Sequence, residues 1–491
     1  MNIEETLLTL KKITEAVNGK EISGKDENLF CFNNVQTDSR SVCELSLFVP
    51  LVGENQDGHK YVPEAVKKGA SVVFINSSEY EKNASVYDEL CKNVEKLFII
   101  TVENTLTALQ KAAGAYVEQF PDLIKVSITG SSGKTTTKEM IVSVLQEKYN
   151  VVYTKGNFNS ETGLPLSVFN IRKNHEVGVF EMGMNRKHEM EEISSVFKPN
   201  FAVITNIGTA HIGLLGSREN IAAEKRHIFD YINENGVAFI PASDDFKDFL
   251  GENVKGEKIY YGPYVSAREN GVRYLCDLGV SGTKFSLDGV EINLKVPGIY
   301  NYSNALAAVA VGKKLGLSAS EIKKGLENIS SVSGRMETFA LMVKNGSKIT
   351  LIKDCYNANP DSMKSALNFM KTLSDVHQKI YVLGDMLELG FESQEAHAEI
   401  GKAVAIDNPD YTVFTGEEMK AAYDQALKLG YVNGKYIKEH DDSAMEKIAV
   451  FLNEKLCESD VLLLKASRGI SLERIIPLIQ KIENEKSGGC N

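Results

Sequence analysis

Short apolar runs alternate with amphipathic stretches through the middle of the chain. The run IKVSITG, beginning at residue 124, has the pattern of a buried strand, and in the following stretch Met140, Ile141, Val144 and Leu145 recur at helical spacing. The runs EVGVFEMG, FAVITNIG and GVAFIPA follow as further strands. Strands that alternate with helices predict a doubly wound, mainly parallel sheet.

The same patterns divide the chain into three parts. The runs LFVPLVG, ASVVFI and KLFIITV lie between polar turns and predict a small mixed α/β domain, whereas KITLIKD, KIYVLGD, YTVFTG and DVLLLKAS predict strands of a second alternating block. A β-rich patch at 258–297 separates the two alternating blocks. At ~150 residues a domain, 491 residues make about three domains. We expect an α/β protein with domains at 1–107, 108–331 and 332–491, the last of them Rossmann-like.

The N-terminus and the composition bear on location and partners. Ile3, Leu7, Leu10, Ile13 and Val17 predict a surface helix, and the acidic start of the chain argues against an export signal. No apolar run approaches the ~20 residues that span a bilayer. Seven cysteines without a CxxC pair argue against a disulfide framework. A net charge of −11 disfavours nucleic acid. We expect a cytoplasmic monomer that does not insert into a membrane.

The stretch SITGSSGKTTTKEM, residues 127–140, has the composition of a phosphate-binding loop. The common pattern G-x-x-x-x-G-K-[ST] requires a glycine at the position of Ile128, so this loop is a shorter form that begins at Gly130. Its N–H groups can bind phosphate, Lys134 can neutralise it, and Thr135 can bind Mg²⁺. We therefore predict that the central domain is a P-loop-type ATPase domain. The predicted ATP contacts of the loop are Gly130, Ser131, Ser132, Gly133, Lys134, Thr135 and Thr136.

Three further side chains are candidates for the chemistry. Glu181 ends an apolar strand, where kinases and GTPases usually have an aspartate that is linked to the metal. His211 lies in a loop after a buried strand, and Lys225 follows on a predicted helix. Taken singly, each has an ordinary alternative: a solvated strand end, a structural histidine and a solvated lysine.

Taken together, these motifs resemble the Mur ligases, three-domain enzymes that form amide bonds with ATP. The resemblance rests on G-x-x-G-K-T, EMG, TNIGTAH and IAAEK, and it extends to VQTDSR, GNFNSETGLPLS, GRMETF, DCYNANPDSM, VLGDMLELG and LLLKASRG. DCYNANPDSM and GDMLELG are similar to the member that adds D-alanyl-D-alanine to UDP-N-acetylmuramoyl-tripeptide. The diaminopimelate motif D-N-P-R of the tripeptide-forming member is missing, since DNPD at 407–410 ends in aspartate.

The resemblance implies roles for particular residues. Lys134, Glu181, His211 and Lys225 would be catalytic, and Mg²⁺, as two ions, would be bound by Thr135, Glu181, His211 and Lys225, the lysine as a carbamate. Asn301, Asn304, Arg335 and Asp354 would bind ATP. The candidates for substrate binding are Ser39, Arg40, Asn157, Asn159, Asn357, Asn359, Lys465, Ser467 and Arg468.

Two departures and several alternatives accompany this interpretation. Tyr300 stands where the family has histidine near the adenine site, and Glu224 precedes Lys225 where relatives often have a small residue. The alternatives are another ligase of the superfamily (tripeptide-forming or folylpolyglutamate-type), a P-loop ATPase switch, and an inactive protein that binds the UDP-sugar-peptide. The sequence leaves open whether the third residue of the peptide is lysine or diaminopimelate.

Overall fold

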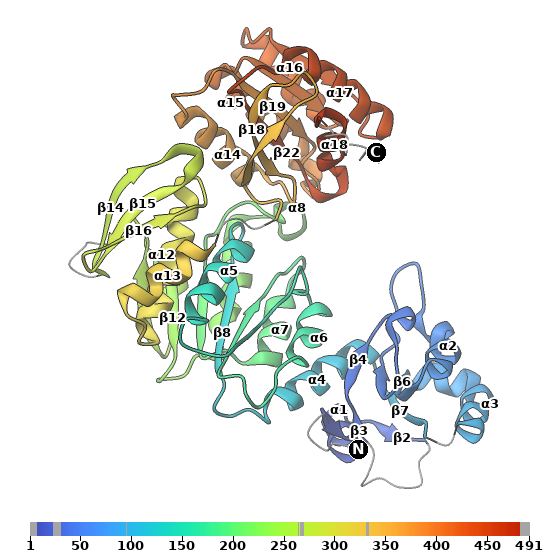
Figure 1. The fold of residues 1–491 in the computed structure, drawn as a ribbon. Coiled ribbons are helices and arrows are strands. Elements are labelled where there is room, and N and C mark those ends of the chain that lie inside the picture. The colour runs from blue at the N-terminus through green and yellow to red at the C-terminus, as the bar shows by residue number, and fades with distance from the viewer. Residues whose placement is uncertain are drawn as a thin grey trace, which may run out of the picture.

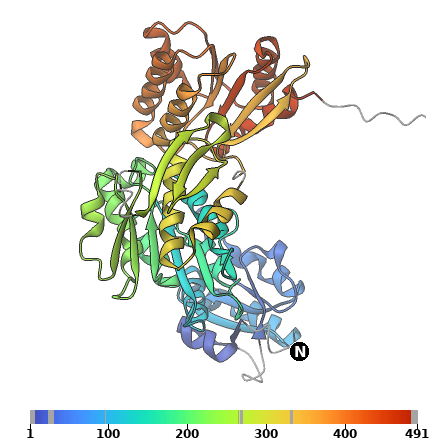
Figure 2. The same ribbon diagram turned by 60° about the vertical axis from the view of Figure 1, so that its left-hand side comes forward.

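The computed structural model describes residues 7–22, 31–94, 96–263, 265, 270–329 and 333–481. Figure 1 shows three α/β units along the chain, with the N-terminal unit beside the lower part of the central one and the C-terminal unit above it. The second view shows the same order of the units from another side (Figure 2). The predicted fold class is confirmed.

The N-terminal unit is built on a five-stranded sheet in the order β2-β7-β6-β5-β4. β2 pairs antiparallel with β7, and the other neighbours are parallel. Its strands are β2 (Lys20–Glu21), β4 (Asn34–Gln36), β5 (Ser46–Phe48), β6 (Ala70–Asn76) and β7 (Phe98–Val102). Its helices α2 (Val62–Lys67) and α3 (Ser77–Asn93) pack on one face, and short 3₁₀ turns lie at Ser39–Ser41 and Gly58–Tyr61.

The predicted N-terminal helix is shorter than the hydrophobic spacing indicated. The structure has a strand, β1 (Leu8–Thr9), paired with β3 (Cys31–Phe32), and α1 begins only at Leu10 and ends at Val17. The hydroxyl of Thr9 caps this helix by accepting a hydrogen bond from the N–H of Lys12. Ile3 lies outside the described residues.

Helix α4 (Thr105–Val117) connects the first unit to the second. Its apolar side chains share one core cluster with α1 and with α7 (Glu189–Phe197) of the central unit. Position 107, the predicted boundary, therefore falls inside a helix that contacts both units. The predicted boundary at 331/332 lies outside the described residues.

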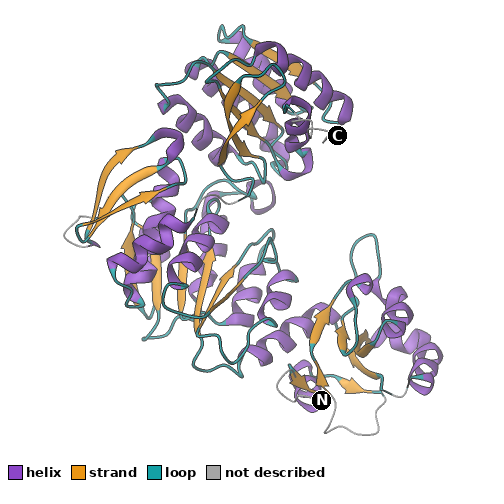
Figure 3. Cartoon of the chain, viewed as in Figure 1, coloured by secondary structure: helices purple, strands orange, loops and turns teal. Residues whose placement is uncertain are grey.

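The central unit contains a parallel six-stranded sheet in the order β13-β12-β11-β8-β10-β9. One face packs on α5 and α12, and the other packs on α4 and α7. This layering of helices and strands is visible in Figure 3. The strands are β8 (Ile124–Thr129), β9 (Val151–Tyr153), β10 (Val177–Glu181), β11 (Phe201–Ile204), β12 (Val237–Pro241) and β13 (Glu257–Tyr261). The helices are α5 (Lys134–Leu145), α6 (Gly163–Val168), α7 (Glu189–Phe197), α8 (Ile212–Leu215), α9 (Arg218–Arg226), α10 (Lys247–Gly251), α12 (Ile299–Lys314) and α13 (Ala319–Asn328).

An antiparallel sheet follows, of β14 (Val272–Asp277), β15 (Thr283–Leu287) and β16 (Val290–Leu294). It accounts for most of the predicted β-rich patch, whereas β13 joins the central sheet instead.

The C-terminal unit has a second six-stranded sheet, in the order β17-β18-β22-β19-β20-β21. Only its edge strand β17 is antiparallel to its neighbour in the sheet, within the described residues. The strands are β17 (Glu337–Met342), β18 (Lys348–Asp354), β19 (Lys379–Gly384), β20 (Tyr411–Thr415), β21 (Gly434–Ile437) and β22 (Val461–Lys465). The helices are α14 (Pro360–Thr372), α15 (Ser393–Asp407), α16 (Met419–Lys428), α17 (Asp442–Lys455) and α18 (Ile475–Ile479).

Candidate functional site

The phosphate loop follows β8, at the carboxyl edge of the central sheet. Gly130 and Gly133 have φ angles of 152° and 81°, and α5 begins directly after them at Lys134. A Cβ atom on Gly130 would lie 1.8 Å from the hydroxyl of Thr205, so the turn requires glycine there. The free N–H groups of the first turn of α5 therefore follow directly on this tight glycine turn. An anion-binding site at a helix N-terminus requires this arrangement.

Lys134 extends back across this loop. Its ammonium donates to the carbonyl of Gly130 at 2.8 Å. Burial lowers the pKa of Lys134, the charge of Glu181 opposes this shift, and Arg335 adds to it. A half-buried lysine with a carboxylate and a second cation nearby is the arrangement expected where polyphosphate binds.

Glu181 ends β10, beside β8, and only 1% of it is exposed. This burial rules out the solvated strand end. Its Oε1 accepts a hydrogen bond from the amide of Asn159 at 2.7 Å, whereas Oε2 has no partner among the described residues. A buried carboxylate oxygen without a donor costs free energy unless a cation or a further donor binds it. The environment of Glu181 therefore fits a metal ligand.

Lys225, on α9, is also 1% exposed, so it is not a solvated lysine. Burial lowers its pKa well below the usual lysine value, and Lys134 is the second cause. The neighbouring Glu224 does not add an unbound charge, because its carboxylate accepts the N–H groups of His188 (3.0 Å) and Met190 (2.9 Å) at the start of α7.

His211 lies directly before α8, with a φ angle of 65°. Its Nδ1 is 3.5 Å from Oε2 of Glu388, which belongs to the C-terminal unit. The two atoms lie within ion-pair distance but without the alignment of a hydrogen bond, since Nδ1 has no hydrogen-bond partner among the described residues.

The central and C-terminal units enclose a cavity of about 640 Å³ at the phosphate loop. Residues predicted to bind ATP or substrates line it from both sides: Ser131, Ser132, Gly133, Lys134, Thr135, Thr136, Asn301, Asn304, Arg335, Asp354, Asn357, Asn359 and Lys465. A cavity of this size with several convergent polar groups is typical of a ligand site.

Several of these residues contact one another directly. Asp354 accepts from Lys465 at 2.5 Å, and the guanidinium of Arg335 lies 4.1 Å from the ring centroid of Tyr356. Asn359 caps α14 and donates across the domain boundary to the hydroxyl of Ser132 at 3.2 Å. The C-terminal unit thus contacts the phosphate loop itself.

Tyr300 lines this cavity as well, and its side chain packs against the core of the C-terminal unit. Burial raises the pKa of its phenol well above the usual tyrosine value, and Asp354 adds to the shift. The phenol is therefore neutral, and its place at the cavity wall is compatible with the stacking of an aromatic ring on a flat ligand.

Other predicted residues lie outside this cavity. Ser39 and Arg40 are in the N-terminal unit, where Ser39 donates to Glu64 and Arg40 pairs with Asp38 at 2.7 Å. The Arg40 hydrogen bond lowers the pKa of Asp38 to about 2. In the C-terminal unit, Ser467 donates to the carbonyl of Ala358. Arg468 is largely exposed and pairs with Glu473.

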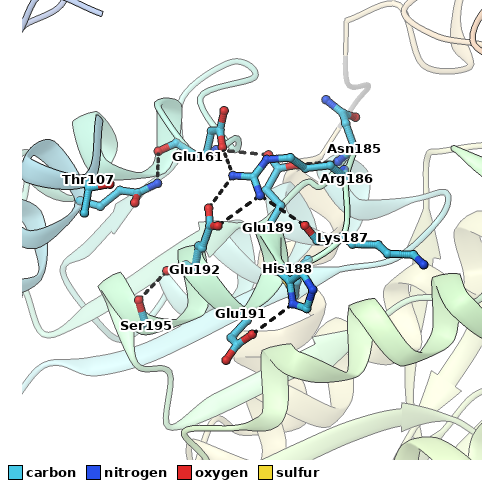
Figure 4. Close-up of polar contacts among 12 residues, drawn as sticks. Thr107, Glu161, Asn185, Arg186, Lys187, His188, Glu189, Glu191, Glu192 and Ser195 are labelled. Atoms are coloured by element: carbon cyan, nitrogen blue, oxygen red, sulfur yellow. Dashed lines mark hydrogen bonds and ion pairs between the residues drawn. The ribbon is translucent and has the colours of Figure 1, made fainter. Parts of the chain in front are cut away.

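The predicted substrate loop, which contains Asn157 and Asn159, is fastened by a charged network. Arg186 pairs with Glu161 of this loop and with Glu192 of α7 (Figure 4). The carboxylate of Glu189 accepts the N–H groups of Asn185 (2.7 Å) and Arg186 (3.2 Å) in the same view. Asn159 therefore contacts Glu181 from a loop that is held at a second point.

Replacing Lys465 by methionine should lower the stability of the protein. Lys465 and Asp354 form a pair in which the lysine is 1% exposed, so the substitution leaves a carboxylate without its cation. Breaking such a pair costs about 3–5 kcal/mol. Urea unfolding monitored by circular dichroism measures the stability. Asp442→Asn, at an exposed ion pair, is the matched control and should change it by less than ~1 kcal/mol; equal losses in both variants would contradict this prediction.

Sequence reasoning missed two acidic residues at this boundary, Asp361 and Glu388. Both lie in stretches quoted for their resemblance, DCYNANPDSM and VLGDMLELG, but neither position has a local pattern that indicates its partner. A second cavity, of about 960 Å³, lies between β13 and α12, and none of the predicted site residues lines it.

The chain matches models of Mur ligase domains along most of its length. The match covers residues 32–117 (Mur ligase family, catalytic domain), 128–312 (Mur ligase middle domain) and 334–468 (Mur ligase, glutamate ligase domain).

Full-length relatives and solved structures agree with this match to the Mur ligase domains. A protein of Treponema pallidum named UDP-N-acetylmuramoyl-tripeptide--D-alanyl-D-alanine ligase is 38% identical, covering 97% of this chain and 99% of that protein. The Bacillus subtilis protein of the same name is 35% identical over 95% and 97% of the two chains. A crystal structure of MurF from Acinetobacter baumannii superposes with a TM-score of 0.81 at 29% identity, over 96% and 98% of the chains. MurF of Thermotoga maritima in complex with ADP gives 0.73 at 26% identity, over 91% and 96%.

Proposed function

The chain belongs to the Mur ligase family, and from that premise we propose that it joins D-alanyl-D-alanine to UDP-N-acetylmuramoyl-tripeptide with ATP, in peptidoglycan precursor synthesis. The observation that carries the proposal is 38% identity, along nearly the whole chain, to a protein with this name. A structure named for the diaminopimelate-adding ligase is only 14% identical, with a TM-score of 0.51, which argues against the tripeptide-forming alternative.

The reaction requires that a carboxylate become a good acylating group. The terminal carboxylate of the tripeptide attacks the γ-phosphorus of ATP, which releases ADP and leaves an acyl phosphate. The amine of D-alanyl-D-alanine then attacks the acyl carbon, the amine loses a proton, and inorganic phosphate leaves. Because the reactants are anions, the protein's main tasks are positioning and charge neutralisation.

The residues around the cavity suit these tasks. Lys134 and the N–H groups at the start of α5 would bind the phosphates, and Arg335 would approach them from the C-terminal unit. Asp354 would accept hydrogen bonds from the ribose, while Tyr300, Asn301 and Asn304 would flank the base. The cavity lies between two domains, and a site of this kind can exclude water. This suits the acyl phosphate, which water would hydrolyse.

The donor set also fits Mg²⁺. The unpartnered Oε2 of Glu181 is the observation that supports it, and Thr135, at the start of α5, lines the cavity. His211, and Lys225 as a carbamate, would complete the set of ligands for two ions; a carbamate is the kind of hard oxygen ligand that Mg²⁺ prefers. Bound there, Mg²⁺ would neutralise charge on the phosphates and on the incoming carboxylate.

The two substrate ends would be held elsewhere. Asn357 and Asn359, with Lys465, Ser467 and Arg468, would bind the dipeptide side, and Asn157 and Asn159 would line the peptide path. Ser39 and Arg40 would contact the UDP end from the N-terminal unit. None of the described helices is long and apolar enough to cross a membrane. We propose that the enzyme acts as a monomer in the cytoplasm, where ATP is available.

Phosphate release under different substrate combinations tests this function. We expect release from ATP only when the UDP-tripeptide and D-alanyl-D-alanine are both present, because an acyl phosphate must be formed and then consumed. Steady release from ATP alone would favour the P-loop switch. Release with the UDP-dipeptide and a free diamino acid would favour the tripeptide-forming reaction.

A further inference from the structure

The loop that carries His211 is held by the C-terminal unit, although it belongs to the central one. Asp361, at the start of α14, accepts a hydrogen bond from the N–H of Thr209 at 2.6 Å and a second from its hydroxyl at 2.9 Å. The carboxylate lies so close that a Cβ on Gly208 would be 2.2 Å from its Oδ2. This double contact joins the two units two residues before His211.

Glu388 makes a second contact, at the imidazole itself. Its Oε2 is 3.5 Å from Nδ1 of His211. Both residues have a φ angle of 65°, a conformation that side-chain-bearing residues adopt rarely and that is concentrated at functional sites. The backbones of the two segments also come close together after these residues: a Cβ on Gly213 would lie 2.9 Å from the carbonyl carbon of Leu389. Figure 1 shows α8 directly beneath the C-terminal unit.

We propose that Glu388 is a positioning residue, which holds the imidazole of His211 by Nδ1 so that Nε2 is free to bind a divalent cation. The inference rests on the proposed function only in assigning a metal to His211. A histidine that binds a metal commonly has its other ring nitrogen held by a carboxylate or carbonyl, which fixes the ring orientation. Here that carboxylate comes from the other domain, so the geometry of His211 depends on contact between the two domains.

Glu388 and Asp361 contact the loop of His211 in different ways. Glu388 is 65% exposed at its side chain, yet its carboxylate oxygen Oε2 lies 3.5 Å from Nδ1 of the ring. Asp361 accepts hydrogen bonds from Thr209 of the loop, and among the described residues no hydrogen bond or ion pair joins it to the imidazole. Only Glu388 contacts the ring from the C-terminal unit among the ion pairs of the described residues.

The test measures Mn²⁺ binding to the full-length protein with saturating ADP, by electron paramagnetic resonance of free Mn²⁺. We expect Glu388→Ala to weaken Mn²⁺ binding by about 10–100-fold, the usual effect of removing such a partner. ADP affinity without metal should stay unchanged, because Glu388 does not line the nucleotide cavity. Glu388→Gln, which keeps an acceptor oxygen, should lose less.

Two further variants separate positioning from general damage. Glu395→Ala removes an exposed carboxylate on the same segment of the chain and should bind Mn²⁺ like the parent protein. Gly213→Ala should weaken Mn²⁺ binding with Glu388 intact, because the new methyl group pushes α8 away from Leu389. Binding by a folded Glu388→Ala variant within about twofold of the parent would overturn the proposal, as would an equal loss in Glu395→Ala. If the parent protein failed to make the amide product, the proposed function would be contradicted, but the Mn²⁺ binding result would remain valid.

Discussion

Lys225→Ala should lose ligase activity by about 10²–10³-fold or more, the scale on which removal of one electrostatic group lowers kcat. The reason is its environment: a fully buried lysine whose pKa burial and Lys134 lower well below the usual value. The lowered pKa favours the neutral amine, which is the form that reacts with CO₂ to give a carbamate and a proton. An ammonium at this position would repel Mg²⁺, whereas the carbamate would bind it.

Chemical rescue and pH test the reason behind this loss. Formate or acetate should restore part of the activity of Lys225→Ala by supplying the missing oxygen ligand. Because protonation removes the reactive amine, the carbamate of the parent protein should be lost as the pH falls through the lowered pKa of Lys225, and added bicarbonate should oppose that loss. Lys138→Ala is the control, since this buried ammonium donates to the carbonyl of Thr154 at 2.7 Å and short carboxylates should not replace it. The carbamate is ruled out if neither anion restores any activity to Lys225→Ala at any pH.

Lys134→Met should lower kcat/KM for ATP by about 10²–10³-fold. The ammonium is half-buried and already oriented by the carbonyl of Gly130 at 2.8 Å, beside the phosphate loop. Methionine has a similar volume and fills the same space, which keeps the loss electrostatic rather than structural.

Initial rates over a range of ATP concentrations measure this effect, with melting temperature as a check on folding. Lys364→Met, at an exposed position on α14, should behave like the parent protein. A folded Lys134→Met variant with kcat/KM close to that of the parent would show that the phosphates bind elsewhere.

The sequence was sufficient where one short stretch determines the structure. Buried parallel strands read as continuous apolar runs, so β8, β10, β18 and β22 were found close to their observed bounds. The shortened phosphate loop could also be recognised from the sequence, because its glycines, Lys134 and the following helix are contiguous. Glu181 was recognised because a carboxylate at the end of an apolar strand is not explained by packing.

The sequence was insufficient where contacts join segments that are far apart in the chain. Asp361 and Thr209 are 152 positions apart, and no local pattern indicates that they pair. The contact of Glu388 with His211 could not be predicted for the same reason, because it depends on how the C-terminal unit packs on the central one. The N-terminal helix was predicted too long because hydrophobic spacing alone does not reveal that Leu8 and Thr9 pair with β3.

The most direct test of the central claim is mass spectrometry of the product formed from ATP, Mg²⁺, UDP-N-acetylmuramoyl-tripeptide and D-alanyl-D-alanine, with phosphate followed in parallel. We predict a UDP-pentapeptide, formed with a single phosphate for each new amide bond, and a comparison of lysine and diaminopimelate tripeptides would then reveal the preference at position three. Phosphate release without any pentapeptide would contradict the account.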